Sequence, residues 1–481
     1  MGKLFFLSAL SIISVVSLFR PWIGVVSAYL IAILTPQAVW FWNFEGLRPA
    51  LWVLLPTVVG FAVALARGDY QSGTIANKRN FFMLGLWLCY NISYYFGPFT
   101  EAGGPFRFTN PDWALSTLNK IFILYFLGVL CIDTEQKLKA LVGVFMLSAV
   151  YLTYWANDRY LSGAVMGRLA GPTDVYGVGI YSDENNFAML FVVALPFLWY
   201  VGYAFSNRLI RWGLWLVIPL GWHAIFLTAS RGGLVGVAVT TLLIAWRSKN
   251  KAFGLLLIPA FAIVYVWQAG DLMRSRAETI GEFQTETSAA TRIQAWTAAG
   301  RMIADHPLTG VGLASFGPAF PFYSNDKPRE AHNTLFQISA ESGATAGAMY
   351  LLLIGTCIRS LWRNGNRLKK ASTAAAPDYL YLINEATLVA LCGLFVCSLF
   401  LSLQMFEIFW SLCLMANAIL YVRWKAERAG TAEVVARDPA PGKPRLRGIA
   451  VGRMSRNTAM TGTARREPET AYHADGHTSL K

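Results

Sequence analysis

Two arginines and one histidine are the residues of this sequence best suited to do chemistry on a charged substrate. Arg231 stands in the segment T-A-S-R-G-G between two apolar runs, Arg292 lies in T-R-I-Q-A-W, and His332 lies in E-A-H-N. A guanidinium group can grip two phosphate oxygens at once, and an imidazole with a pKa near its usual value of about 6.5 can accept a proton at neutral pH. We predict that the three side chains meet at the membrane surface and act on a phosphate-bearing substrate.

Each of these residues also has a simpler interpretation. A lone arginine at a helix end can snorkel to the membrane interface, and Arg292 on a loop helix can be a solvated surface residue. His306 precedes a proline and can shape a turn. His332 is the best-placed general base, because it lies shortly before an apolar span and is flanked by Glu330 and Asn333.

Several catalytic motifs are absent from the sequence. It contains no D-x-D, no G-x-x-x-x-G-K-[ST], and no H-E-x-x-H or histidine cluster. Their absence argues against a metal–nucleotide-sugar platform, ATP-driven transport and zinc catalysis. Charge stabilisation by arginines and proton removal by a histidine remain, so we expect the chemistry to use neither a metal ion nor a cofactor.

The composition is that of an integral membrane protein. Of the 481 residues, 55% are hydrophobic and only 14% are charged, against about 25% charged residues in a soluble domain. The apolar runs have the length of membrane-spanning helices rather than of barrel strands. We therefore predict an all-α, polytopic transmembrane bundle of about 13 spans, with one long, partly helical extracytoplasmic loop.

The predicted spans divide the chain into five regions. They lie at about 4–19, 23–42, 50–66, 81–99, 115–132, 138–155, 186–205, 209–228, 232–246, 252–267, 341–361, 383–403 and 405–421. We expect an N-terminal transmembrane region (1–182), core transmembrane helices with the Arg231 motif (183–267), a catalytic loop (268–340), C-terminal transmembrane helices (341–422) and a disordered basic tail (423–481).

Loop charges predict the orientation of these regions. The net charge is +14, but one set of alternate short loops holds 16 Lys and Arg residues and the other set holds four besides Arg231 itself. The tail from residue 423 adds 12 basic against 6 acidic residues. This is the positive-inside pattern of a multi-pass protein, not a nucleic-acid-binding surface. It puts the tail in the cytoplasm, and Arg231 and the long loop on the outer side.

Local patterns predict how the outer segments fold. A helix is expected to start near Ser182 or Asp183, either of which could cap it. In the long loop, residues 287–304 have helical character, H-P-L-T-G-V-G breaks that helix, and residues 330–340 are expected to be helical again.

These motifs together resemble the O-antigen ligase and O-antigen polymerase superfamily. The resemblance rests on T-A-S-R-G-G, R-x-x-x-W at Arg292, H-P-x-x-G-x-G, and H-N followed by E-x-G from His332 to Gly343. It covers about residues 183–361. The N-terminal half, with R-P-W-I-G at Arg20–Gly24, is most similar to the exosortase-A-associated O-glycosylation ligases.

The resemblance implies a metal-independent, inverting glycosyltransferase of the bacterial inner membrane with a periplasmic loop. Its donor would be a glycan on a polyprenyl-diphosphate carrier, and its acceptor a glycan, lipid or protein. Arg231 and Arg292 would hold the diphosphate and His332 would activate the acceptor hydroxyl. The adjacent residues that would contact substrate are Asn333, Glu341, Asp183 and Asn186.

Two alternatives stay open at this point. A polysaccharide polymerase would use the same donor chemistry and extend a lipid-linked chain. A transporter of lipid-linked oligosaccharides would need charged side chains along a path through the bilayer, and Glu407 is the clearest charge in such a position.

Overall fold

Helices are the only regular elements in the described part of the chain. The computed structural model describes residues 2–44, 46–70, 75–104, 109–173, 179–278, 287–371 and 378–437, with backbone only at 287–289, 370–371 and 429–437. One compact unit, Met1–Ala429, holds all of these helices except the last turns of the final one. The predicted disordered tail begins differently, because residues 423–437 are the end of a helix that starts at Glu407. Residues 438–481, the rest of that tail, lie outside the described residues.

The N-terminal half forms a series of apolar helices before the residues of interest. They are α1 (Gly2–Phe19), α2 (Pro21–Leu34), α3 (Pro36–Val39), α4 (Phe41–Phe44), α5 (Pro49–Ala66), α6 (Lys78–Phe96), η2 (Thr100–Ala102), α7 (Pro111–Cys131) and α8 (Glu135–Leu161). Asn or Thr side chains cap several of their first turns, among them Asn77, Asn110 and Thr134.

The C-terminal half carries the predicted site. Its transmembrane part begins with α9 (Glu184–Gly202), α10 (Arg208–Thr228), α11 (Arg231–Arg247), α12 (Lys251–Leu255) and α13 (Leu257–Gln268). The long segment that follows holds α14 (Asp271–Glu278), α15 (Thr287–Asp305) and α16 (Phe316–Ser324). The chain then returns through α17 (Thr334–Ala371), α18 (Tyr379–Ser398) and α19 (Glu407–Arg437).

Nine helices within the described residues are long and apolar enough to cross a membrane. Other helices lie at predicted spans but are not among the nine; α2, for example, has only 14 residues. The prediction of a polytopic helical bundle is confirmed, whereas the count of about 13 spans stays a prediction. The chain is a multi-pass membrane protein.

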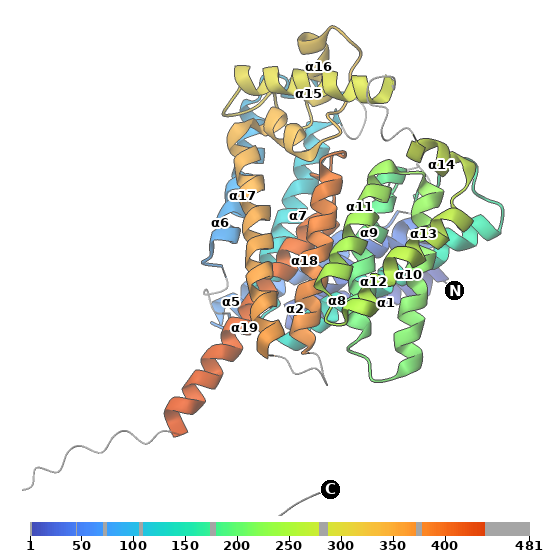
Figure 1. Ribbon diagram of the computed structural model, residues 1–481. Coiled ribbons are helices and arrows are strands. Elements are labelled where there is room, and N and C mark those ends of the chain that lie inside the picture. The colour runs from blue at the N-terminus through green and yellow to red at the C-terminus, as the bar shows by residue number, and fades with distance from the viewer. Residues whose placement is uncertain are drawn as a thin grey trace, which may run out of the picture. The chain divides into compact units, whose positions relative to one another are not determined.

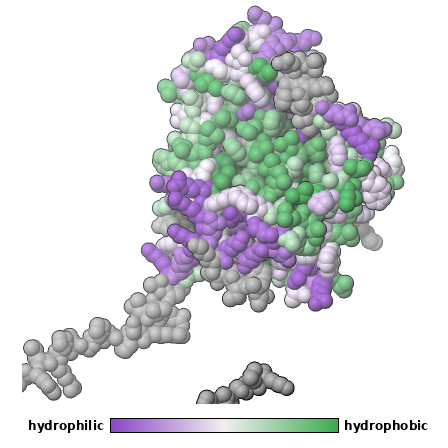
Figure 2. Space-filling view, viewed as in Figure 1, coloured by the Kyte–Doolittle hydropathy of each residue, from purple (hydrophilic) through white to green (hydrophobic). Residues whose placement is uncertain are grey.

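Two helices form the interior of this bundle. α9 and α18 bury 89% and 83% of their most apolar 18 residues and pack against each other. α1 and the span formed by α12 and α13 bury only 11% and lie at the periphery. α9 also packs on α10 and α11, and α17 packs on α6 and α18 (Figure 1). Figure 2 shows a band of hydrophobic side chains across the middle of one face, with hydrophilic residues gathered on both sides of it.

The segment between α13 and α17 has a small core of its own. Alanines and Met302 on one face of α15 pack against Phe316 and Phe320 of α16 and against Val311. α15 confirms the predicted helix at 287–304, and Figure 1 shows it lying across one end of the bundle, next to the start of α17. The loop is therefore a folded cap over the bundle end that carries the candidate residues.

Candidate functional site

Three helices begin at the site, and each has a polar cap. Asp183 caps α9, because its Oδ1 accepts hydrogen bonds from the backbone N–H groups of Asn185 (2.8 Å) and Asn186 (3.0 Å). This confirms the predicted cap. Ser230 caps α11 by accepting from the N–H of Gly233 at 3.1 Å. These caps satisfy amide donors that a helix start would otherwise leave unpaired.

The starts of α9 and α11 are joined directly. Ser230 Oγ donates to Asn185 Oδ1 at 2.9 Å, and Arg168 Nη2 donates to the same oxygen at 3.1 Å. A Cβ on Gly233 would lie 2.8 Å from the Cβ of Ala188, so this glycine lets α11 approach α9 closely. At Gly232, by contrast, an added Cβ would meet nothing nearer than 3.9 Å. Gly232 therefore leaves open space beside Arg231, whereas Gly233 does not.

Arg231 starts α11 and is tied to the long segment. Its Nε donates to the carbonyl oxygen of Arg276 at 2.8 Å, and Arg276 Nε donates to the carbonyl oxygen of Ala229 at 2.9 Å. This exchange fixes α14 against the start of α11. Arg231 does not line the cavity described below, but Ser230 next to it contacts Asn185, which does.

His332 lies before α17 rather than within it. Its backbone is in the left-handed region, with φ of 46°, and the helix begins two residues later at Thr334. Asn333 accepts from the N–H of Phe336 at 3.1 Å, and its Nδ2 donates to the carbonyl oxygen of Leu399 at 3.0 Å. The expectation of a helix from residue 330 was therefore wrong at its start, because a positive φ and a capping asparagine interrupt it.

α15 is fastened to the chain beside His332. Trp296 Nε1 donates to the carbonyl oxygen of Ala331 at 2.9 Å, and the indole stacks on Phe336 with ring centroids 5.8 Å apart. Arg292 lies one turn earlier on the same helix face. Its charge acts on His332, as the pKa of that histidine shows below. The R-x-x-x-W pattern thus combines an anchor with a cation near the histidine.

The H-P-L-T-G-V-G segment packs against the first turns of α17. Val311 N–H donates to the carbonyl oxygen of Ala340 at 2.8 Å, and Gly312 N–H to that of Glu341 at 3.1 Å. Gly310 has φ of 67°, and a Cβ there would lie 2.2 Å from backbone atoms of Glu341. Only glycine fits this backbone-to-backbone contact. α17 then departs from helical geometry at Gly343, with φ of 88° and ψ of 162°.

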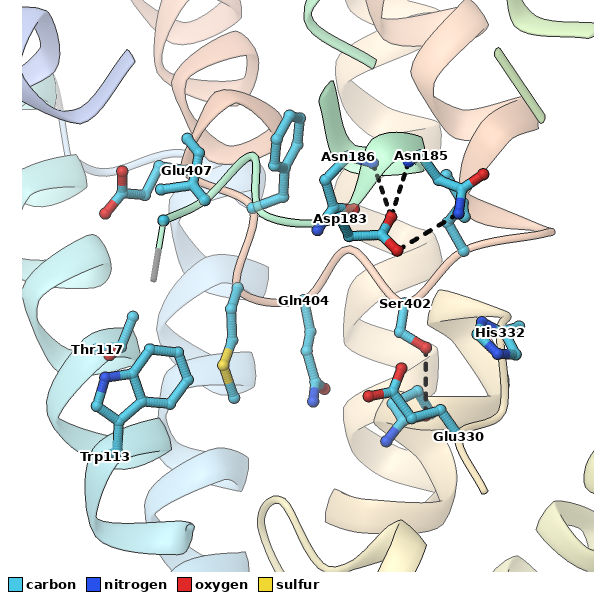
Figure 3. Close-up of a pocket in the computed structure, with 16 residues that line it drawn as sticks. Trp113, Thr117, Asp183, Asn185, Asn186, Glu330, His332, Ser402, Gln404 and Glu407 are labelled. Carbon is cyan, nitrogen blue, oxygen red and sulfur yellow. Dashed lines mark hydrogen bonds between the residues drawn. The ribbon is translucent and has the colours of Figure 1, made fainter. Parts of the chain in front are cut away.

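A cavity of about 250 Å³ opens beside His332. The start of α9 supplies Asp183, Asn185 and Asn186, the segment before α17 supplies Glu330 and His332, and the chain between α18 and α19 supplies Leu401, Ser402 and Gln404 among others. Figure 3 shows Asp183, Glu330 and His332 near one another, with Trp113 and Glu407 toward the other end of the cavity. Of the predicted residues, Asp183, Asn186 and His332 line this cavity.

Burial, together with nearby charges, shifts the pKa values of two groups beside the cavity in opposite directions. Burial of the imidazole among protein atoms lowers the pKa of His332 below 6.5, and the positive charge of Arg292 lowers it further. The negative charge of Asp183 raises it again in part. Surrounding protein also raises the pKa of Glu330 above 4.5, and the nearby Asp183 carboxylate adds to that effect. His332 and Glu330 keep exposed surface because they face the cavity. His332 is therefore a neutral imidazole at neutral pH, the form that accepts a proton.

Glu341 is buried behind the cavity rather than in it. Its Oε1 accepts from Gln337 Nε2 at 2.5 Å, and its Oε2 accepts from Gln404 Nε2 at 2.8 Å. Glu341 and Asn333 thus hold other parts of the site in position, without facing the cavity themselves.

Sequence reasoning missed the parts of the cavity wall that the segment after α18 and the start of α7 supply. Ser402 and Gln404 follow α18, and Trp113 comes from the start of α7. The one signal was Gln404 and Glu407 standing close together between two apolar runs. In the described residues, no group of three or more His, Cys, Asp or Glu side chains is arranged to hold a metal ion.

The geometry can be compared with known families. Residues 216–351 match the family model of O-antigen ligase. The matched region runs from within α10 into α17 and includes Arg231, Arg292, His332 and Glu341. This match to part of the chain indicates a membrane enzyme of the O-antigen ligase or polymerase type, and it suggests glycosyl transfer. A search of curated proteins found no match to this chain.

Proposed function

We propose that this protein transfers a glycan from a polyprenyl-diphosphate carrier to an acceptor hydroxyl on the extracytoplasmic side of the bacterial inner membrane. The reaction inverts the anomeric carbon and uses no metal ion. The proposed reaction is that of a ligase, in which a finished glycan is moved as one block. Polymerisation uses the same donor chemistry and is the alternative that the experiment below distinguishes.

The proposed reaction is a single displacement. His332 takes the proton of the acceptor hydroxyl, and the oxygen attacks the anomeric carbon from the face opposite the leaving group. The bond from that carbon to the diphosphate oxygen breaks, and its electron pair leaves with the lipid diphosphate. Arg231 and Arg292 bind the negative charge that develops on the diphosphate.

One observation carries the proposal. His332 faces a cavity and is held neutral by surrounding protein and by the adjacent positive charge of Arg292. A cation beside a neutral imidazole suits a reaction that removes a proton at one atom while negative charge appears at another. Arg231 supports it more indirectly, through the contact of Ser230 with Asn185 at the cavity wall.

The test compares the glycans attached to cellular acceptors in cells that make wild-type protein or His332→Ala. We expect the transferred glycan to disappear with His332→Ala and to persist with His306→Gln, a matched histidine outside the cavity. Mass analysis of the glycans and immunoblots of membrane-inserted protein are the two measurements. Full transfer by His332→Ala at equal protein levels would refute the proposal. A ladder of repeat lengths that depends on His332 would instead identify a polymerase.

A further inference from the structure

The cavity beside His332 has a polar wall that is rich in carboxylates. Asp183, Glu330 and Glu407 line it, and among the residues that the structure describes no lysine or arginine does. A diphosphate would be repelled by this wall, because like charges at close range destabilise each other. Hydroxyl groups, which donate hydrogen bonds to carboxylate and amide oxygens, suit it well.

Gln404 supplies a buried hydrogen-bond acceptor. Its Nε2 donates to Glu341 Oε2 at 2.8 Å. The carbonyl oxygen of Gln404 then points the other way. That oxygen is buried and has no hydrogen-bond partner among the described residues. An unsatisfied buried acceptor costs about 1–3 kcal/mol, and a ligand hydroxyl would remove this cost.

The other end of the cavity offers an aromatic surface. Trp113 lines it from the start of α7, and Figure 3 shows its ring on the side of Gln404 away from His332. An indole presents a large apolar face to the C–H groups of a sugar ring. The volume of about 250 Å³ is compatible with a ligand the size of one sugar residue.

We propose that this cavity binds the acceptor sugar, that this sugar is neutral or amino-substituted rather than acidic, and that Gln404 and Trp113 recognise it. The assignment to the acceptor rests on the proposed function. The base must contact the acceptor hydroxyl, and His332, the proposed base, lines the cavity. Arg231 and Arg292 would hold the donor diphosphate, and neither of them lines the cavity.

The test measures sugar binding to the full chain in lipid nanodiscs, because many detergents carry sugar headgroups. Saturation-transfer NMR is recorded with methyl glycosides of N-acetylglucosamine, glucosamine and glucuronic acid. We expect binding of the first two, and a much weaker signal from the acidic glycoside. Gln404→Leu should weaken binding roughly tenfold, Trp113→Ala should abolish it, and Trp212→Ala, an exposed tryptophan of α10 outside the cavity, should leave it unchanged. Equal binding of glucuronide, or undiminished binding by Gln404→Leu, would overturn the proposal.

A competition arm separates acceptor from donor. A short-chain farnesyl-diphospho-N-acetylglucosamine is added at saturation, and a glycoside signal that persists supports the acceptor assignment. A signal lost by competition would place the donor sugar in the cavity and overturn that assignment. Failure of the proposed function would look different, since binding would then persist in these experiments while glycan transfer in cells proved independent of His332.

Discussion

Ser230 Oγ donates a hydrogen bond to Asn185 Oδ1 over 2.9 Å, and this bond joins the starts of two transmembrane helices. Arg231 follows Ser230 directly, and Asn185 lies two residues after Asp183 at the cavity wall. The position of Arg231 relative to the cavity is thus set by the packing of α11 on α9, which is helped by the close approach at Gly233. A change at this contact would move the guanidinium group away from its proposed partner.

We expect Arg231→Lys and Arg292→Lys each to lower turnover by roughly 10²–10³-fold, the usual cost of removing one preorganised donor from a developing anion. Lysine keeps the charge but loses the two-pronged contact with phosphate oxygens. Initial rates of glycan transfer in isolated membranes measure the effect. Arg301→Lys is the matched control on α15, because Arg301 is exposed and its Nη1 contacts the carbonyl oxygen of Tyr323. Wild-type rates for both site variants would contradict the assigned roles.

Transfer should stay active at a lower pH than an ordinary histidine base would allow. The pKa of His332 lies below 6.5, so the imidazole stays neutral as the pH falls to that value, and the rate declines only below it. Asp183 raises this pKa, so Asp183→Asn should shift the decline to still lower pH, while asparagine keeps the helix cap. Arg292→Gln should shift the decline upward. The pH dependence of the transfer rate tests both signs, and shifts in the opposite directions would exclude His332 as the group that titrates.

Gly310→Ala should disrupt the packing of the segment around Gly310 on the first turns of α17. The new Cβ would lie 2.2 Å from the backbone of Glu341, and an L-residue at φ of 67° costs about 1–2 kcal/mol in addition. We expect a large drop in melting temperature and loss of activity. Gly300→Ala is the control, since that helical glycine has nothing within 4 Å of an added Cβ, and alanine there should stabilise by about 0.5–1 kcal/mol. Equal melting temperatures for the two variants would show that the contact is not required.

A buried ion pair between α11 and α18 should matter for stability. Arg247 Nη2 lies 2.9 Å from Glu385 Oε1, Arg247 Nε contacts the second carboxylate oxygen, and both side chains are buried. Removing one partner of a buried pair lowers the free energy of unfolding by about 3–5 kcal/mol, because the other charge stays buried. We therefore expect Arg247→Met to destabilise strongly, and Arg247→Met with Glu385→Leu to recover most of the loss. Thermal unfolding in nanodiscs measures both, and a double variant as unstable as the single one would contradict this account.

The sequence predicted local features well and long-range contacts poorly. The cap at Asp183 and the helix at 287–304 follow from residue types and periodicity over a few positions, and both are present. The other lining residues of the cavity were not predicted, because Trp113 and Gln404 come to line the same cavity as His332 only after distant helices have packed. Nor does any local pattern reveal the left-handed backbone at His332, which a neighbouring contact of Asn333 with Leu399 helps to hold.

The three capped helix starts have an electrostatic consequence for the whole end of the bundle. A helix start carries roughly half a positive charge from its aligned peptide groups, and α9, α11 and α17 all begin beside the site. The opposite, negative end of α18 is also near, but Leu399 and Leu401 carbonyl oxygens there already accept from Asn333 and Thr334. The helix starts therefore offset part of the negative charge of the three carboxylates that line the cavity, and variants of Arg231 or Arg292 would retain this backbone contribution.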